Sequence, residues 1–325
     1  MQQEKYLYSF TYHDTEKELC KLESKYIFNK EDKEKLLFSN LKVEPSSSAF
    51  IKSRLELMVS SPDYPTLINK IKAENIIVDD FKIEYLVFDG DETPYDGRLE
   101  KLRDIGYSIH GNPDYYKPKI IYALCCFEGT WFFGILNKDK FAWRKHDKKP
   151  SSYSNSININ IAKSLVNLAS RGNKENTLID ACCGVGTIML EACFVGIDIE
   201  GCEINHKICK GARTNLSHFN YEAEVHRSDI KDITKKYDAA IIDLPYNVMS
   251  SVTESDVLHI IESTTKVSDQ LVIVSTADIS KFIEKVGFEI LDHCSVNKKG
   301  KSSFARRIWV CGKKLTESKT EDCKS

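Results

Sequence analysis

Apolar and polar positions change period repeatedly along the N-terminal part of the chain. Runs with a period of two predict strands over Tyr6–Tyr12, Ala49–Val59 and Phe81–Phe88. Patterns with a period of 3.6 predict helices over Asp14–Phe28 and Tyr64–Ile71. The resulting β–α–β–α–β order is typical of a small α+β module.

A turn-rich stretch, 89–97, leads to a short predicted helix over Arg98–Ile105. Two apolar runs, Lys119–Cys126 and Thr130–Leu136, are separated by three residues that include a glycine, which predicts a β-hairpin. The segment 144–157 is polar, basic and rich in serine, so we expect a linker there.

From Asn158 onward, an amphipathic helix over Ile159–Leu168 is followed by short apolar runs that alternate with helical patterns. This alternation predicts right-handed βαβ units and a parallel sheet covered on both faces. Two last strands, Glu289–Val296 and Phe304–Gly312, have no helix between them, which predicts a terminal antiparallel hairpin. The expected parallel strands are Thr177–Cys182, Ile199–Ile204, Ala223–His226, Ala239–Leu244 and Gln270–Thr276, and the helices between or after them are Thr187–Val195, His206–His218, Glu254–Val267 and Ile279–Val286.

The composition narrows the class of protein. A chain of 325 residues is long enough for two or three domains, and its formal charge of −2 means that any nucleic-acid surface must be local. No apolar stretch reaches the ~18 residues of a membrane span, and the N-terminus lacks the pattern of a signal peptide. The 11 cysteines form no CxxC pair, so we expect reduced, buried thiols in a cytoplasmic protein and no metal site.

The segment Asp180-Ala-Cys-Cys-Gly-Val-Gly-Thr187 predicts a sharp turn from a strand into a helix. Gly184 and Gly186 permit positive φ and close approach of a ligand, and the helix that begins near Thr187 offers free N–H groups. Met189 occupies the position of the third glycine of a dinucleotide site, so the close helix–strand packing of such sites is not expected. Asp180 suits a cationic ligand group such as an ammonium.

Acidic residues also follow the next two strands. Glu203 is placed to accept hydrogen bonds from ribose hydroxyls, and Asp229, after Ser228, from an adenine amino group. The alternatives are a glycine turn without a ligand, a surface charge at Glu203 and a turn cap at Asp229. Acidic residues at three successive strand ends favour a nucleoside cofactor with an ammonium group, and S-adenosylmethionine is such a cofactor.

The strand over 239–244 ends in Asp243-Leu-Pro-Tyr246. The exocyclic amine of a base is a poor nucleophile, because its lone pair is delocalised into the ring. The Asp243 carboxylate and the Leu244 carbonyl are two acceptors for the hydrogens of such an amine, Asp243 can take the released proton, and Tyr246 can stack on the base. The alternative is a strand that ends in an ordinary Asx/Pro turn.

Two basic clusters are candidates for contact with RNA phosphates. Solvated loops are the alternative interpretation of both clusters. We expect the two clusters to flank one RNA groove. Their members are Arg144, Lys145, His146, Lys148 and Lys149 in the linker, and Lys298, Lys299, Lys301, Arg306 and Arg307 in the terminal hairpin.

The motifs Asp180–Ala192 and Asp243–Tyr246, together with the helix Ile159–Ala169, resemble the THUMP-associated tRNA guanosine-N2 methyltransferases. The resemblance implies a class I S-adenosylmethionine-dependent methyltransferase fold, with a seven-stranded doubly wound sheet and a terminal antiparallel hairpin. It also implies tRNA as the substrate, and some relatives need a small activator subunit. The implied domains are a ferredoxin-like domain over 1–75, a truncated THUMP-like RNA-binding region over 76–143, a linker over 144–157, the methyltransferase domain over 158–313 and a disordered tail over 314–325.

The resemblance also implies roles for individual residues. Those for the cofactor are Asp180, Cys182, Gly184, Gly186, Thr187, Glu203, Ile204, Ser228 and Asp229, and those for the base are Asp243, Leu244, Pro245 and Tyr246. Ala181-Cys182 and Asn247 depart from the usual family motifs. Methylation of adenine N6 or cytosine N4, and a fold that binds RNA without catalysis, remain alternatives.

Overall fold

The computed structural model describes residues 4–152, 156–245, 253–297 and 305–314. The chain divides into two compact units, and it passes from the first to the second and back before it enters the second again. Unit 1 consists of Met1–Thr11 and Lys30–Phe141, and unit 2 of Tyr12–Asn29 and Ala142–Ser325. Among the described residues, none of the helices has both the length and the apolar character that a membrane crossing requires.

Unit 1 is built on one six-stranded sheet with the order β2-β1-β3-β6-β5-β4. Neighbouring strands are antiparallel except for β4 and β5, which are parallel. The strands are β1 (Tyr6–Phe10), β2 (Leu36–Ser39), β3 (Ile51–Ser61), β4 (Phe81–Leu86), β5 (Ile120–Phe127) and β6 (Thr130–Lys138).

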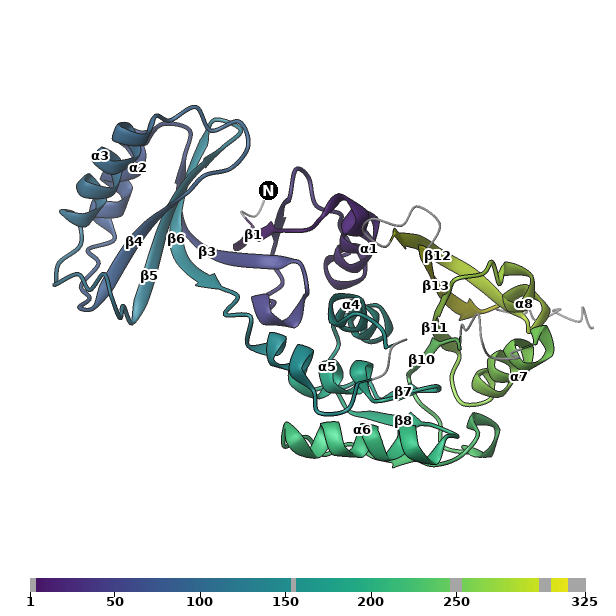
Figure 1. Ribbon diagram of the computed structural model, residues 1–325. Helices are drawn as coiled ribbons and strands as arrows, with labels where there is room; N and C mark the ends of the chain where they lie inside the picture. The colour runs from purple at the N-terminus through teal and green to yellow at the C-terminus, as the bar shows by residue number, and fades with distance from the viewer. Residues whose placement is uncertain (1–3, 153–155, 246–252, 298–304, 315–325) are drawn as a thin grey trace, which may run out of the picture. The chain divides into compact units, whose positions relative to one another are not determined.

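Two helices of unit 1, α2 (Tyr64–Ala73) and α3 (Tyr95–Gly106), lie on the same side of this sheet (Figure 1). Leu67 of α2 and Ile105 of α3 are fully buried and share one core with Phe133 of β6. The helices therefore cover the apolar face that the period-two pattern of the strands creates.

The structure of unit 1 differs from the predicted domain boundary at 75/76. Strands β1 to β3 precede that boundary and β4 to β6 follow it, yet all six belong to one sheet because β3 pairs with β6 over Ser53–Ser61. The predicted hairpin is present as β5 and β6. Strand β2 is absent from the predicted elements because its four residues are too few to show a period.

Unit 2 contains a seven-stranded sheet with the order β12-β13-β11-β10-β7-β8-β9. Strand β13 is antiparallel to both of its neighbours, and the other described pairings outside it are parallel. This topology confirms the predicted class I methyltransferase fold with its terminal antiparallel hairpin. The strands are β7 (Leu178–Asp180), β8 (Ile199–Cys202), β9 (Val225–His226), β10 (Ala239–Asp243), β11 (Gln270–Ser275), β12 (Phe288–Asn297) and β13 (Ala305–Lys313).

Helices cover both faces of the central strands. Ile242 of β10 and Ile273 of β11 share a core with Ile261 and Ile283. Ile241, the residue before Ile242 in β10, is also fully buried. Because successive side chains of a strand point to opposite faces, burial of both sets requires cover on both sides. The helices of this layer arrangement are α4 (Ile159–Ser170), α5 (Thr187–Val195), α6 (His206–His218), α7 (Glu254–Thr265) and α8 (Ser280–Lys285).

Helix α1 (Lys17–Phe28) belongs to unit 2, although the sequence predicts it as part of an N-terminal domain. The Nζ atom of Lys25 lies 2.8 Å from a carboxylate oxygen of Asp292 in β12. Asn167 of α4 donates a buried hydrogen bond of 2.7 Å to Glu23. The amphipathic pattern of α1 predicts a buried face but does not say what covers that face. The polar contacts to α4 and β12 show that the helix packs on these two elements.

The predicted linker at 144–157 begins as a docked 3-10 segment, η3 (Ala142–Lys148). Trp143 and His146 of this segment are both fully buried. The Nδ1 atom of His146 lies 2.7 Å from Glu191 Oε1, and Lys163 donates to the other oxygen of Glu191 at 3.1 Å. A buried ionic cluster thus fixes the start of this segment to α4 and α5, which the polar composition alone did not indicate.

Candidate active site

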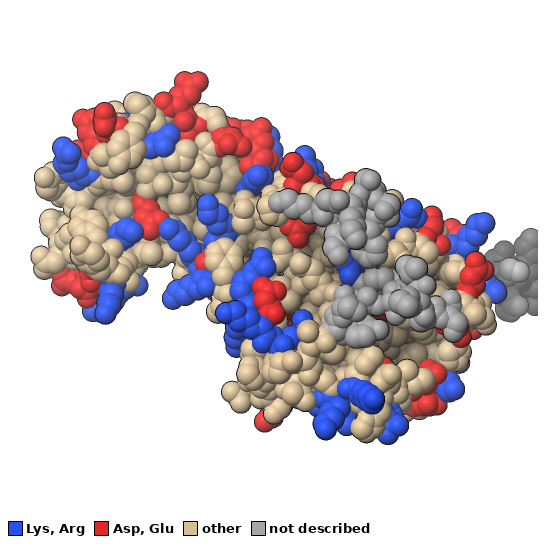
Figure 2. Space-filling view, viewed as in Figure 1, with Lys and Arg blue, Asp and Glu red and all other residues tan. Residues whose placement is uncertain are grey.

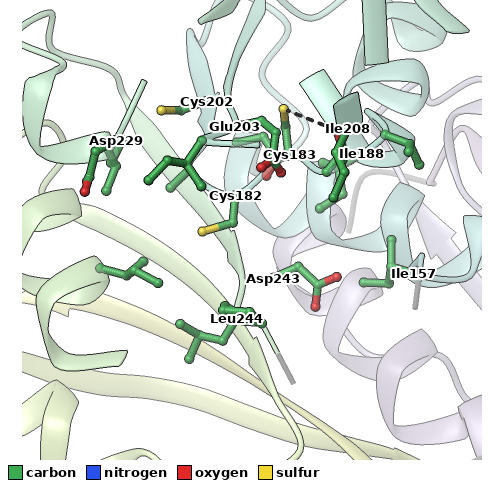
Figure 3. A pocket seen from close by; sticks show the side chains of 18 of the residues that line it. Ile157, Cys182, Cys183, Ile188, Cys202, Glu203, Ile208, Asp229, Asp243 and Leu244 are labelled. Carbon is green, nitrogen blue, oxygen red and sulfur yellow. Dashed lines mark hydrogen bonds between the residues drawn. The ribbon is translucent and has the colours of Figure 1, made fainter. Parts of the chain in front are cut away.

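A cavity of about 400 Å³ lies at the carboxyl ends of the strands of unit 2. The chain runs from β7 to β8 and β9 in one direction and from β10 to β11 in the other, so the sheet has a switch point between β7 and β10. Open α/β sheets bind their ligands at such a point. In Figure 3, Asp229 lies at one end of the pocket and Ile157 at the other, with Cys182, Glu203 and Asp243 between them.

The structure brings together most of the residues that the sequence singled out. Among the residues predicted for the cofactor and the base, Gly186 and Tyr246 are the exceptions, because Gly186 does not line the cavity and Tyr246 lies outside the described residues, as does Asn247. The predicted residues that line the cavity are Asp180, Cys182, Gly184, Thr187, Glu203, Ile204, Ser228, Asp229, Asp243, Leu244 and Pro245.

Asp180 is the last residue of β7 and is completely buried. Neither of its carboxylate oxygens has a well-formed hydrogen bond to the described residues. Burial raises the pKa of Asp180 well above its ordinary value, and the nearby Asp243 carboxylate raises it further, while the backbone N–H of Cys182 partly offsets the shift. A buried carboxylate without a well-formed hydrogen bond is costly unless a positive ligand group compensates it.

The glycine turn after Asp180 has the conformation that the sequence predicts. Gly184 and Gly186 have φ values of 54° and 80°, and Gly186 is the N-cap of α5. A Cβ at Gly184 would meet no atom within 4 Å, whereas a Cβ at Gly186 would lie 3.3 Å from the Cβ of Ala212. Gly184 therefore leaves open space beside the cavity, and Gly186 lets α6 approach the turn.

Close packing between α5 and the sheet is present, contrary to the expectation drawn from Met189. A Cβ at Gly201 of β8 would lie 2.4 Å from the Sδ atom of Met189 and 2.9 Å from the Sγ atom of Cys183. The small residue that close packing requires thus lies on the strand, and the helix supplies the large one. The sequence pattern of the turn alone does not reveal this exchange.

Glu203 and Asp229 each combine a cavity-lining position with a local structural role. Glu203 accepts a hydrogen bond of 2.7 Å from the backbone N–H of Asn205, and burial raises the pKa of its carboxyl group. Asp229 caps a turn by accepting from the N–H of Lys231 at 3.0 Å. Turn capping and cofactor contact, which the sequence posed as alternatives, are compatible in this geometry. Ile204 beside them is 71% exposed, an unusual position for a large apolar side chain.

Asp243 ends β10, next to β7 in the sheet. Its Oδ1 atom is buried and has no hydrogen-bond partner among the described residues. Burial raises the pKa of Asp243 to about 7, and the positive charge of Arg306 acts in the opposite direction. Leu244 is buried and donates its N–H to the carbonyl of Val274 at 3.0 Å, which fixes the backbone immediately after the acid.

Helix α7 adds residues that the sequence reasoning missed. Asp256, His259 and Ile260 line the cavity, and His259 Nε2 lies 3.5 Å from Asp229 Oδ2. Their spacing of three and four residues places them on one face of a helix. This spacing is the feature of the sequence that could have pointed to them as members of the site. Ser156 and Ile157, just before α4, also line the cavity, although the sequence suggested only a linker there.

The described basic residues of the predicted RNA clusters differ in their contacts with the rest of the protein. Lys145 lies over the rings of Phe194, Phe219 and Tyr221, and Arg144 lies 3.6 Å from Asp147. Burial lowers the pKa of Lys149, whereas Lys148 is exposed.

In the terminal hairpin, Arg307 lies 3.3 Å from Asp278, and Lys298, Lys299 and Lys301 lie outside the described residues. Figure 2 shows a group of Lys and Arg side chains on the visible face, next to the place where α5 lies in Figure 1.

A second polar cluster is formed by Glu200, Glu224 and His226, whose ligand atoms are within 4.8 Å of one another. Glu200 accepts hydrogen bonds of 2.7 Å from His226 and Tyr237 and also pairs with Lys235. These contacts lower the pKa of Glu200 to about 2, although burial acts in the opposite direction. The arrangement is an ion-pair network between β8 and β9.

Residues 146–259, which contain most of the cavity, match a family described as RMKL-like, methyltransferase domain. The chain is also similar to curated proteins over part of its length. It is 32% identical over 120 residues to a tRNA (guanine(10)-N2)-dimethyltransferase of Methanothermobacter thermautotrophicus, covering 36% of this chain and 35% of that protein. A protein of the same name from Pyrococcus abyssi is 28% identical over 167 residues, covering 47% and 49%.

The chain thus spans about half or less of the length of these two curated relatives. Among solved structures, TrmN from Thermus thermophilus has a TM-score of 0.48 at 13% identity and covers 95% of this chain and 99% of its own. A putative RNA methyltransferase from Pyrococcus horikoshii has a TM-score of 0.44 at 18% identity and covers 54% of this chain and 98% of its own.

Proposed function

We propose that the protein transfers a methyl group from S-adenosylmethionine to the exocyclic N2 of a guanosine in tRNA. The observation that carries the proposal is the position of Asp243. Its buried Oδ1 atom lacks a partner among the described residues, and it lines the same cavity as the unpartnered carboxylate of Asp180. One cavity thus offers an acceptor for a substrate amine and a second acidic group for a cationic cofactor.

The residues of the cavity fit S-adenosylmethionine. The Asp180 carboxylate matches the cofactor's ammonium group, because a positive charge there would relieve the cost of burying an ionised acid. Glu203 has a carboxylate for the ribose hydroxyls, and the exposed side chain of Ile204 offers an apolar surface to the adenine. When bound, this cofactor supplies an electrophilic methyl group.

The chain's own contribution to the transfer is positioning and acceptance of a proton. The ionised Asp243 carboxylate and the Leu244 carbonyl accept hydrogen bonds from the amine, which localises the nitrogen lone pair. Asp243 then takes the proton that the methylated nitrogen releases. Its pKa of about 7 suits this role, since a base works best when its pKa lies near the working pH. Holding the amine in line contributes by proximity.

Two observations support tRNA as the substrate. Curated proteins to which part of the chain is similar carry the name tRNA (guanine(10)-N2)-dimethyltransferase. The basic residues of η3, including Arg144 and Lys148, belong to the same unit as the cavity and provide phosphate contacts. Residues 76–143 of unit 1 add a further RNA-docking surface in this proposal. The free described cysteines fit a reducing, cytoplasmic setting.

The test is methylation of tRNA by the purified chain with isotope-labelled S-adenosylmethionine, followed by mass spectrometry of the nucleosides. We expect N2-methylated guanosine from tRNA and no product from duplex DNA. Label in adenine N6 or cytosine N4 would overturn the proposed substrate. Activity that appears only after cell extract is added would show that a further subunit is required.

The Asp243→Asn variant tests the role of the acid. We expect it to lose methyl transfer while it still binds S-adenosylhomocysteine in calorimetry. Asp269→Asn is a matched control, because Asp269 is an exposed acid that pairs with Lys313. Full activity of Asp243→Asn would remove the proposed mechanism.

A further inference from the structure

The side chain of Asn215 connects two separate parts of the methyltransferase domain. Asn215 lies on α6 and is completely buried. Its Nδ2 atom donates to the carbonyl of Val185 at 2.8 Å and to the carbonyl of Ser151 at 2.8 Å. Its Oδ1 atom accepts from the N–H of Ser151, also at 2.8 Å. Both amide hydrogens and the amide oxygen are therefore used.

The two partners of Asn215 lie at functional places. Val185 is the middle residue of the glycine turn and lines the cavity. Ser151 follows η3, whose basic residues are candidates for contact with RNA, and precedes Ser156 and Ile157, which also line the cavity. One buried amide thus holds the turn and the segment that approaches it.

The packing around Asn215 leaves little room for either part to move. A Cβ at Gly211, one turn earlier in α6, would lie 3.2 Å from the Cβ of Ser151 and 3.5 Å from Cγ1 of Val185. Ala212 of the same helix approaches Gly186 closely, as described above. The turn that contains Gly184 and Gly186 has positive φ at both glycines, and each glycine gives the backbone freedom that external contacts must restrict.

We propose that Asn215 is a positioning residue that holds the glycine turn in its cofactor-binding conformation and ties it to the segment after η3. The inference rests on the proposed function, since the turn is taken to bind S-adenosylmethionine. Asn215 itself lies outside the residues that line the cavity. It acts through the carbonyl of Val185, and a preorganised turn loses less conformational entropy when the ligand binds.

The decisive variant is Asn215→Asp, which keeps an acceptor for the N–H of Ser151 but removes both donors. A carboxylate would then meet the carbonyl oxygens of Ser151 and Val185. The matched control is Asn220→Asp, which makes the same chemical change at an exposed position just after α6. Affinity for S-adenosylhomocysteine is measured by calorimetry at a temperature where circular dichroism shows both variants folded.

We expect Asn215→Asp to bind S-adenosylhomocysteine at least about tenfold more weakly, and Asn220→Asp to bind within about twofold of the wild type. In activity assays, KM for S-adenosylmethionine should rise while KM for tRNA changes little. Hydrogen exchange at 184–187 should accelerate in Asn215→Asp. Folded Asn215→Asp with unchanged affinity and unchanged exchange would overturn the inference.

A second variant covers the case in which Asn215→Asp does not fold. Gly211→Ala adds one methyl group against Ser151 and Val185 without adding charge, and we expect it to weaken binding about threefold. Unchanged affinity of folded Gly211→Ala would then overturn the inference. Failure of the wild type to bind S-adenosylhomocysteine is a different result, because it would refute the proposed function before any variant is compared.

Discussion

Asp180 and Asp243 end two adjacent parallel strands, β7 and β10, and line the same cavity. Burial raises the pKa of both carboxyl groups, and the charge of Asp243 raises that of Asp180 further. A buried acid beside a partly buried acid at the neighbouring strand end is unfavourable in the absence of positive charge. A cationic ligand bound between these two acids would offset that cost, so the pair is what we expect of a binding site for such a ligand.

Replacing Asp180 by Asn should weaken cofactor binding because the variant lacks the charge that complements an ammonium group. We expect the Kd for S-adenosylmethionine to rise by about 10- to 100-fold in calorimetry. The variant also removes the cost of an ionised buried acid, so the melting temperature of the ligand-free protein should not fall. Unchanged affinity would show that Asp180 does not contact the cofactor.

The rate of methyl transfer should depend on the ionisation of Asp243. Its pKa is raised to about 7, so the fraction of the active, deprotonated form falls about tenfold for each pH unit below that value. We therefore expect kcat/KM for tRNA to rise with pH up to about 7 and then to level off. The measurement is a pH profile with binding of S-adenosylhomocysteine followed in parallel. A flat profile between about pH 5.5 and 8.5 argues against Asp243 as the base.

Arg306 should set the position of that profile. Its positive charge lowers the pKa of Asp243 against the effect of burial, so Arg306→Ala should move the acidic limb to higher pH, by roughly 0.5 to 1 unit. Arg307→Ala is the matched control, because Arg307 pairs with Asp278. Equal shifts in the two variants would contradict a specific effect of Arg306 on Asp243.

The packing of Met189 on Gly201 predicts a destabilised Gly201→Ala variant. The added Cβ would lie 2.4 Å from Sδ of Met189, and overpacking of this kind typically costs about 1–3 kcal/mol of unfolding free energy. The loss should be smaller when the substitution is made in Met189→Ala, because the shorter side chain leaves room. Urea unfolding of the single and double variants measures this coupling, with Gly106→Ala as a control at a less crowded site. If the losses of unfolding free energy of the two single variants simply add in the double variant, Gly201 and Met189 are not in the close contact described here.

The η3 segment should contribute to tRNA affinity through its charges. We expect Arg144→Glu combined with Lys148→Glu to raise KM for tRNA by about tenfold and to reduce the salt dependence of binding. Binding of S-adenosylhomocysteine should not change. Lys281→Glu combined with Lys285→Glu, at exposed positions of α8, is the control with the same change of net charge. If the two proteins bind tRNA equally, the segment is not part of the RNA surface.

Much of the fold and of the site follows from local sequence patterns. The strand that ends in Asp180, the glycine turn and the strand that ends in Asp243 lie where the patterns predict, because strand ends and turns depend on neighbouring residues. The convergence of Asp180, Glu203, Asp229 and Asp243 on one cavity also follows from the sequence, since parallel strands bring their carboxyl ends to one edge.

Other features depend on contacts between residues far apart in the chain, and only the tertiary structure decided them. The pattern of α1 indicates an apolar face but not its partner, which the pairing of Lys25 with Asp292 across 267 positions identifies. The linker composition does not reveal that His146 is buried against Glu191, nor does any motif mark Asn215.

The sequence by itself thus determined the order of the elements, the cavity-lining acids and the chemistry they suit, because these depend on short-range periodicity and on the geometry of a parallel sheet. Tertiary structure decided which unit each segment joins and which buried amide supports the glycine turn. Those choices depend on shape and on hydrogen-bond partners that meet only after the chain has folded.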